Sequence, residues 1–459
     1  MQTHPYIPNS GPEIKKEMLE AIGVKSAEEL FVDIPEKLRF KGSLRLPHCS
    51  SELEVRRHLD ALLSRNEASG TLLSFLGAGC WPHYVPAVCE EINSRSEFLT
   101  AYAGDVYSDL GRYQALFEFQ SMLGDLIGMD VVSLPWYDWA SVAGDAARMA
   151  VVATGRHELL VPRTISPERL SVLRAYSEGL ADIKLIKNNC ESGQLNLEDV
   201  EAQISSDTAA VYIENPTYHG VVEAQGEEIS RLVHNHGALF IVGVEPLSLG
   251  VLTPPGEYGA DIVCGEGQPL GMHLSFGGSL LGFLACRDTE QLVSAVPHRL
   301  ITLTTTGEKD QWGFTYVLPQ RTMFAAREKA RSLTGTATAL WAITAAVYMS
   351  LLGPQGMREL AEAIVQKSYY AMKRISEIDG LKVPVFDSFH FQEFTVNFDS
   401  ARKTVRDINE ALLKSGIVGG KDITAEFPEL GNTGLYCVTE IHSKTDIDRL
   451  AAALEETLQ

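Results

Sequence analysis

The sequence predicts an α/β protein with a large, mostly parallel sheet between layers of helices, followed by a small α+β domain. Two observations carry this prediction. Between residues 153 and 287, short apolar runs alternate with amphipathic helical patterns, which is the order expected of parallel strands joined by crossover helices. After residue 321 the pattern becomes helical and then ends in a mixture of short strand-like and helical segments.

The apolar runs of the central region are nearly continuous, which indicates strands buried on both faces of a sheet. The segments expected to form strands are ELLVP, IKLI, AAVYIE, ALFIVGV, DIVCGE and SLLGFLAC, and those expected to form helices between them are SPERLSVLRAYSEGL, LNLEDVEAQIS and EEISRLVHNHG.

The chain divides into three expected regions. Residues 1–70 read as an N-terminal helical arm, because Pro-rich turns separate short amphipathic segments. Residues 71–325 form the large α/β domain, and residues 326–459 form a helical connection and the small C-terminal domain. In the last region we expect two long helices broken at Gly353-Pro354, since proline ends or kinks a helix.

Composition excludes several classes of partner. The 459 residues contain 39 Lys and Arg against 60 Asp and Glu, a formal net charge of −21. A surface this acidic repels nucleic-acid backbones and anionic lipid headgroups. No apolar stretch has the roughly 18 residues of a membrane span, and the first residues lack the pattern of a signal peptide, so we expect a cytoplasmic protein. The seven scattered cysteines are expected to be reduced.

Common catalytic motifs are missing. The glycine-rich residues 265–271 and 275–282 carry neither a P-loop nor a dinucleotide fingerprint; they fit tight turns between core strands and a ligand-facing loop equally well. His234 and His236 end an expected helix, and their spacing does not place them on one helical face. We therefore expect no metal site.

Several longer segments, in order along the chain, identify a family. They are KEMLEAIGVKSAEELFVDIPEKLR, LSFLGAGCWPHYVPAV, SRSEFLTAY, QALFEFQSMLGDLIGMDV, LTPPGEYGADIVCGEGQPLG, LSFGGSLLGFLA, AAVYMSLLGPQGMRELAE and YCVTEIHSKTDID. With them the chain resembles the glycine decarboxylase P-protein family over nearly its whole length. It is most similar to subunit 1 of the two-chain form, the amino-terminal half of the split enzyme.

The resemblance implies a fold-type-I aminotransferase-like fold and the cofactor pyridoxal phosphate. It also implies that the complex releases carbon dioxide from glycine and passes the aminomethyl group to a lipoylated H-protein. Such chemistry needs a Schiff-base lysine, an acidic partner for the pyridinium nitrogen, and a phosphate cradle at a helix N-terminus.

This chain departs from the family pattern at all three positions. Pro269 stands near the position of the lysine, Glu245 stands where an aspartate is usual, and Trp139 replaces a glycine of the cradle. We therefore expect no catalytic residue and no cofactor-binding residue in this chain alone. The resemblance then implies that the cofactor is bound mainly by a lysine-bearing subunit 2, in a heterotetramer with two copies of each chain.

The resemblance also suggests which residues complete the partner's site. The candidates are Tyr102, Tyr107, Arg112 and Gln114, in and beside a segment, 103–113, where this chain differs from the common family pattern. Two alternatives stay open. The chain could be a non-catalytic pseudoenzyme that forms a scaffold homodimer, or it could be half of a related two-chain enzyme with an altered substrate.

Overall fold

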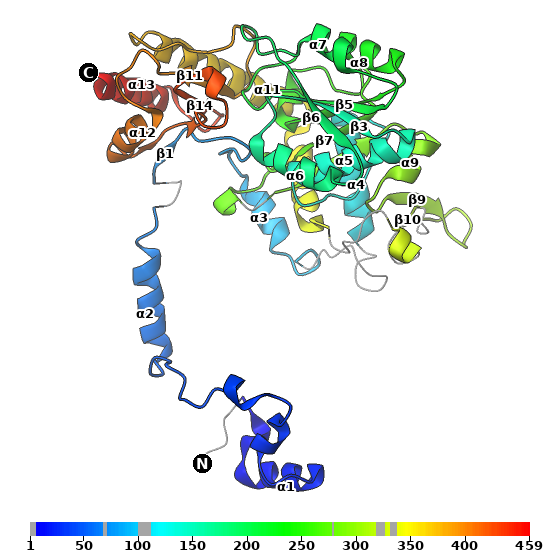
Figure 1. Ribbon diagram of the computed structural model, residues 1–459, viewed down its shortest axis with the longest axis vertical. Coiled ribbons are helices and arrows are strands. Elements are labelled where there is room, and N and C mark those ends of the chain that lie inside the picture. Colours follow the sequence, from blue (N-terminus) through cyan, green and yellow to red (C-terminus); the bar gives the residue numbers. More distant parts are fainter. Residues whose placement is uncertain (1–5, 68–70, 100–111, 278–279, 318–325, 331–336) are drawn as a thin grey trace. The chain divides into compact units, whose positions relative to one another are not determined.

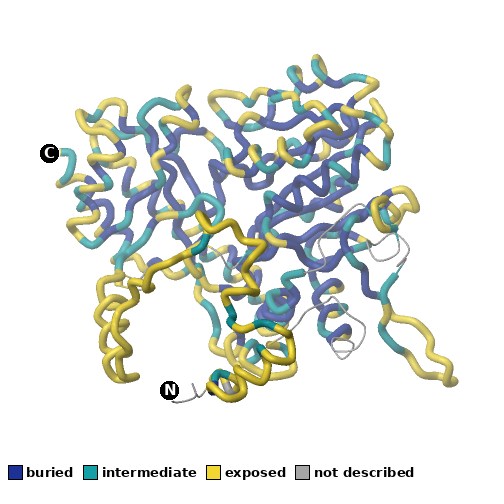
Figure 2. Tube along the Cα trace, turned by 60° about the horizontal axis from the view of Figure 1, so that its bottom comes forward, coloured by how far each residue is buried: buried dark blue, intermediate teal, exposed yellow. Residues whose placement is uncertain are grey.

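The computed structural model describes residues 6–67, 71–99, 112–277, 280–317, 326–330 and 337–459. The chain forms two units, Met1–Glu67 and Ala68–Gln459. The first unit contains helices α1 (Pro12–Ile22) and α2 (Glu52–Leu63). A capping box between Ser51 and Glu54 begins α2, but neither helix buries a residue, and the yellow trace in Figure 2 shows this exposure.

A seven-stranded sheet forms the centre of the second unit (Figure 1). In spatial order its strands are β2 (Val131–Val132), β8 (Gly282–Cys286), β7 (Ile262–Glu266), β6 (Leu239–Val244), β5 (Thr208–Glu214), β3 (Glu158–Pro162) and β4 (Asp182–Ile186). From β7 to β4 every neighbouring pair is parallel, whereas β8 runs antiparallel to β7 and β2. The α/β fold with a mostly parallel sheet is confirmed; β2 was not expected.

Two apolar layers cover this sheet. Consecutive residues of a strand point to opposite faces, so Phe240 and Val242 of β6 join one buried cluster while Ile241 joins the other. The first cluster includes residues of α4 (Tyr113–Ile127), α7 (Leu197–Gln203), α8 (Gly226–Asn235) and α11 (Ala339–Ser376). The second includes residues of α5 (Trp139–Thr154), α6 (Pro167–Ser177) and α9 (Glu290–Ala295).

The long helix α11 leads from the large layer to the C-terminal elements. Its regular geometry is interrupted at Gly353, which has φ 61° and ψ −179° directly before Pro354, so the expected break is confirmed. Residues after the break pack in both directions: Ile364 belongs to the first cluster, and Ile375 belongs to the C-terminal core. No helix among the described residues is long and apolar enough to cross a membrane.

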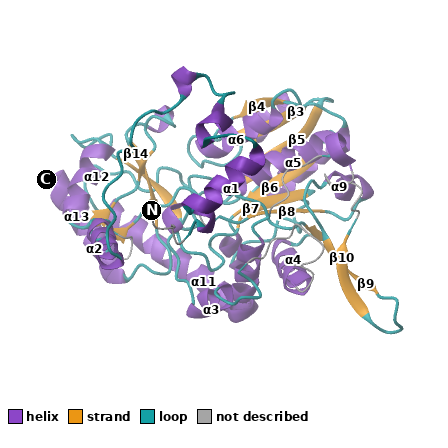
Figure 3. Ribbon diagram, turned by 90° about the horizontal axis from the view of Figure 1, so that it is seen from below, coloured by secondary structure: helices purple, strands orange, loops and turns teal. Residues whose placement is uncertain are grey.

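The C-terminal elements form a small antiparallel sheet with two helices. The sheet order is β11 (Glu393–Asn397), β14 (Thr433–Cys437) and β13 (Lys421–Asp422), and the helices are α12 (Val405–Lys414) and α13 (Lys444–Leu458). Two short pieces, β1 (Leu73–Ser74) and β12 (Ile417–Val418), pair in parallel beside it. Between β8 and α11, β9 (Ile301–Thr305) and β10 (Trp312–Tyr316) form an antiparallel hairpin, and Figure 3 shows it reaching away from the sheet. Residues 87–93 form α3 (Ala87–Asn93).

Gly220 joins the large sheet to the C-terminal elements. It lies in the turn after β5 with φ +80°, and a Cβ atom there would lie 1.8 Å from the carbonyl oxygen of Glu393. Phe391 donates a backbone hydrogen bond of 2.9 Å to the Gly220 carbonyl. Only glycine allows this approach of two backbones.

We expect Gly220→Ala to lower the free energy of unfolding by roughly 3 kcal/mol or more, because the new Cβ would overlap backbone atoms. Gly155→Ala is the matched control: Gly155 also has a positive φ, +69°, but faces open space, so its loss is about 1 kcal/mol. Urea unfolding of both variants measures the difference, and equal losses would contradict the close packing at Gly220.

Candidate functional site

Three carboxylates mark the edge of the central sheet where the parallel strands end. Glu214 is the last residue of β5, Glu245 directly follows β6, and Glu266 is the last residue of β7. All three are buried. In open α/β sheets, ligands bind outside the carboxyl ends of the strands, so this edge is the candidate site.

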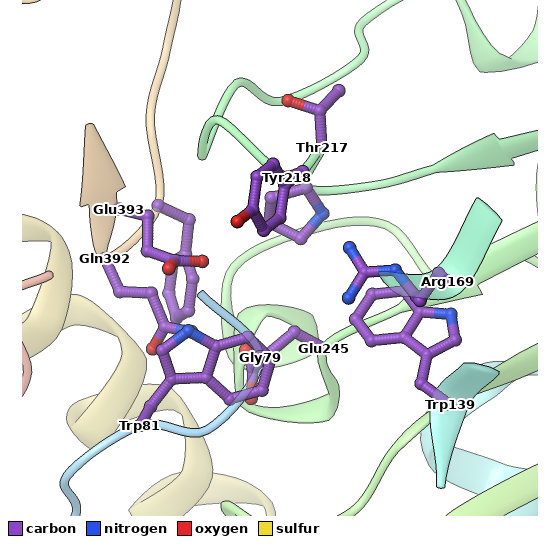
Figure 4. Close-up of a pocket in the computed structure, with 11 residues that line it drawn as sticks. Gly79, Trp81, Trp139, Arg169, Thr217, Tyr218, Glu245, Gln392 and Glu393 are labelled. Atoms are coloured by element: carbon purple, nitrogen blue, oxygen red, sulfur yellow. The ribbon is translucent and has the colours of Figure 1, made fainter. Parts of the chain in front are cut away.

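A nearly filled pocket lies at this edge (Figure 4). The free volume between its side chains is about 10 Å³, which accommodates roughly one water molecule. The residues that line it are Gly79, Trp81, Trp139, Arg169, Pro216, Thr217, Tyr218, Glu245, Phe391, Gln392 and Glu393.

A buried ion pair occupies one side of the pocket. Arg169 donates two hydrogen bonds to the Glu214 carboxylate, from Nε to Oε1 at 2.6 Å and from Nη2 to Oε2 at 2.7 Å. The guanidinium lies over the Trp139 ring, 4.2 Å from its centroid, as Figure 4 shows. Trp139 Nε1 donates to the Tyr212 hydroxyl (3.1 Å), which donates to Glu214 Oε1 (3.0 Å). These four side chains form one closed network.

The carboxyl group of Glu266 lies at the N-terminus of α5, where free backbone N–H groups commonly bind an anion. Its Oε2 accepts from the Trp139 backbone N–H at 3.2 Å, while Oε1 accepts from Gln268 and Leu281. In the same first turn, the Ser141 N–H donates to the Asp138 side chain at 2.7 Å. Burial raises the pKa of Glu266 to about 8, although its hydrogen bonds oppose the shift.

Two further carboxylates are buried in the same region. Glu245 accepts from the backbone N–H groups of Leu247 and Ser248 and so caps the turn that follows β6. Glu393 accepts from the Ala78 N–H at 2.6 Å. Burial raises the pKa of each to about 7. Glu245 therefore stabilises the turn that follows it, and Glu393 holds the distant segment that contains Ala78.

The described part of the glycine-rich segment after β7 begins with turns. Gly267 donates to the Leu281 carbonyl at 2.8 Å. Pro269 lies buried in these turns. Its neighbour Gln268 accepts from the Trp81 N–H and donates to the Trp81 and Met272 carbonyls. The Gln268 side chain thus holds the backbone of Trp81 against these turns.

A buried Ser133, His298 and Asp145 chain superficially resembles a hydrolase triad. His298 Nδ1 lies 3.1 Å from Ser133 Oγ, and its Nε2 lies 2.9 Å from Asp145 Oδ2. The three residues are 1%, 3% and 5% exposed, respectively. No substrate reaches a serine hydroxyl buried this deeply, so these three side chains are a hydrogen-bonded part of the core.

Comparison with known proteins identifies the family of this chain. A family model described as glycine cleavage system P-protein matches residues 4–454. The chain belongs to the glycine cleavage system P-protein family.

Its curated relatives extend over the same length. A probable glycine dehydrogenase (decarboxylating) subunit 1 of Staphylothermus marinus is 43% identical and covers 100% of this chain and 99% of its own. A protein of the same name from Bacillus pumilus is 39% identical, with 97% of both chains covered. A crystal structure of glycine decarboxylase (P-protein) in inhibitor-bound form has TM-score 0.85 and 32% identity over 100% of both chains. Within the P-protein family, this chain is of the subunit 1 type.

The fold is that of the pyridoxal-phosphate enzymes of fold type I. A sphingosine-1-phosphate lyase of Burkholderia pseudomallei shares it, with TM-score 0.64 at 15% identity. The residues of this P-protein chain do not fit that cofactor, however. The pocket leaves room for about one water molecule, no lysine is among its lining residues, and the first N–H of α5 is bonded to Glu266.

The residues expected to reach a partner's site lie in different places. Tyr102 and Tyr107 are outside the described residues. Arg112 is buried and its Nε donates to the Glu97 carbonyl at 2.5 Å. Gln114 is exposed on the first turn of α4 and bonds Glu118 at 3.0 Å. Their role toward a partner stays a prediction.

Sequence reasoning singled out Trp139 and Glu245 but missed other buried side chains in and beside the pocket. Arg169, Glu214 and Glu393 were not singled out, although AAVYIE ends visibly in a glutamate. An acidic residue that closes an apolar strand was the available signal for Glu214. Arg169 gave none, because in the sequence it looks like an ordinary charged residue of an amphipathic helix.

We expect Glu393→Gln to change the pH dependence of stability. The unfolded carboxyl ionises near pH 4.5, while the folded one keeps its proton to about pH 7, so rising pH between these values favours the unfolded state of the unmodified chain. The free energy of unfolding should fall by on the order of 2–3 kcal/mol relative to the variant across this range.

Urea unfolding from pH 5 to 8 provides the measurement. Glu455→Gln is the control, because Glu455 is exposed and its removal should leave the pH profile unchanged. Parallel profiles for the unmodified chain and Glu393→Gln would contradict the buried, protonated carboxyl.

Proposed function

We propose that this chain is subunit 1 of a two-chain glycine dehydrogenase (decarboxylating) whose pyridoxal phosphate is held by a lysine-bearing subunit 2. The complex would release carbon dioxide from glycine and transfer the aminomethyl group to a lipoylated H-protein. The relatives that support this proposal are about 40% identical over almost the whole chain and carry the subunit 1 name.

The observation that carries the proposal is the filled pocket at the ends of β5, β6 and β7. Trp139 and the Arg169–Glu214 pair take up its space, and Pro269 follows β7. A chain with this edge contributes to catalysis through a second chain. We propose a heterotetramer with two copies of each subunit, in which Tyr102, Tyr107, Arg112 and Gln114 form part of the wall of the partner's site.

Reconstitution tests the assignment. We expect carbon dioxide exchange from glycine only when this chain, its lysine-bearing partner, pyridoxal phosphate and lipoylated H-protein are combined. The chain alone should give no visible imine absorbance with pyridoxal phosphate. An imine formed by the chain alone would contradict the proposal, as would a stable homodimer that ignores the partner. Turnover of a different amino acid by the complex would reject glycine as the substrate.

The same assay tests the wall of the site. We expect Gln114→Ala to lower the exchange rate of the complex by about tenfold, because an amide at a partner's pocket supplies hydrogen bonds to its contents. Gln355→Ala is the matched control. Gln355 is also exposed and bonds the glutamate four residues later, Glu359, at 2.8 Å. Equal rates for the two variants would remove Gln114 from the site.

A further inference from the structure

A second, open cavity lies at the same edge of the sheet, where β3 and β4 end. Its free volume is about 470 Å³, within the range of small-molecule sites. One wall follows β3 and β4 and carries Arg163, Thr164, Lys187 and Asn188. The opposite wall comes from the C-terminal elements. His219, in the turn after β5, lies between the walls.

Buried polar atoms without partners gather on this cavity. Neither ring nitrogen of His219 has a hydrogen-bond partner among the described residues, and the same holds for Thr164 Oγ1 and Asn188 Oδ1. His219 is 1% exposed. Since buried polar groups in folded proteins are almost always paired, this grouping on one cavity points to a ligand that supplies the missing partners.

The protonation state of His219 determines which hydrogen-bonding groups a ligand must supply. Burial lowers its pKa to about 3, and the neighbouring His390 adds to the shift, so the ring is neutral at working pH. A neutral imidazole offers one donor and one acceptor. Phe386 and Phe427 hold the ring, with centroid distances of 5.5 and 4.5 Å. A ligand group that both accepts and donates would satisfy it.

The charges on the walls indicate the rest of the ligand. Among the described residues, Arg163 forms no ion pair, and the Lys187 ammonium group forms one, with Asp199 at 3.7 Å. The opposite wall carries Lys382 but also Asp399 and Glu429. Both oxygens of Asp399 already accept hydrogen bonds, from Asn432 and Asn397. The first wall is thus cationic, while the second accepts hydrogen bonds and positive charge.

We propose that this cavity binds a small organic anion, with its carboxylate or phosphate on Arg163 and Lys187 and its hydroxyl or ammonium groups toward His219 and the acidic wall. The proposal is independent of the two-chain function, because the cavity lies within this chain. Calorimetric titration of the full-length chain alone tests it, with serine and glycerol 3-phosphate as probes and uncharged glycerol as the control.

We expect serine or glycerol 3-phosphate to bind and glycerol not to bind. Whichever probe binds identifies the anionic group as carboxylate or phosphate. Arg163→Gln and Lys187→Gln should each weaken that probe by on the order of tenfold. Both side chains are exposed, as is that of Lys373 on α11, so Lys373→Gln is the matched control. Binding of no probe, or equal affinity in all variants, would overturn the proposal.

His219→Phe separates a binding role from a structural one. The variant keeps the aromatic contacts with Phe386 and Phe427 and removes the two unpaired nitrogens. We expect thermal stability without probe to stay equal or to rise, while probe affinity falls roughly tenfold. Unchanged affinity in His219→Phe would show that the ring serves packing alone and would overturn its part in the site.

Discussion

The ion pair between Arg169 and Glu214 is the interaction on which the closed edge of the sheet depends. The two side chains are 8% and 1% exposed, respectively, so each charge has lost its water. Removal of one partner from a buried pair of this kind lowers the free energy of unfolding by several kcal/mol, because the other charge is left uncompensated. The pair also fixes Trp139, which lies under the guanidinium and reaches Glu214 through Tyr212. Trp139 and Arg169 are among the side chains that leave the pocket at this edge nearly filled.

Two buried carboxylates at the closed edge of the sheet differ in one physical respect from the polar groups of the open cavity. At the closed edge, the carboxylates of Glu245 and Glu266 accept hydrogen bonds from backbone N–H groups of nearby turns. These groups are satisfied without any ligand. In the open cavity, His219 and Thr164 have polar atoms with no partner among the described residues. The first arrangement stabilises the turns at the edge of the sheet, whereas the second carries the free-energy cost of unpaired buried polar atoms.

The layered fold was predictable because each strand and helix leaves its pattern in one contiguous segment of the sequence. Buried strands such as β3 and β6 read as apolar runs, and the interruption at Gly353 follows from Gly-Pro within a helical pattern. The P-protein family was recognisable for the same reason, since its motifs are contiguous segments. The resemblance also pointed to Trp139 and Pro269 as departures from the family pattern.

The contents of the pocket were not predictable in this way. Arg169 meets Glu214 from 45 residues away, and Glu393 meets Ala78 from 315 residues away. Neither pairing leaves a periodic trace in the sequence, because it depends on how the sheet and the C-terminal elements fold together. Arg112 is a further example: the resemblance made it a candidate for the wall of a partner's site, but the hydrogen bond from its Nε to the Glu97 carbonyl could not be read from the sequence.

The turn after β5 separates the closed pocket from the open cavity. Tyr218 lines the closed pocket and His219 lines the open cavity, and Lys421 donates to the Tyr218 hydroxyl at 2.9 Å from the C-terminal side. On the closed side, Arg169 is already paired with Glu214, and burial raises the pKa of Glu245 and Glu393 to about 7, so the residues that line this pocket offer an added anion no unpaired cation. On the open side, Arg163 and Lys187 face free volume in a chain whose net charge is −21. Local charge decides where a small anion settles, so such a molecule is drawn to the ends of β3 and β4 and not to the ends of β5 to β7.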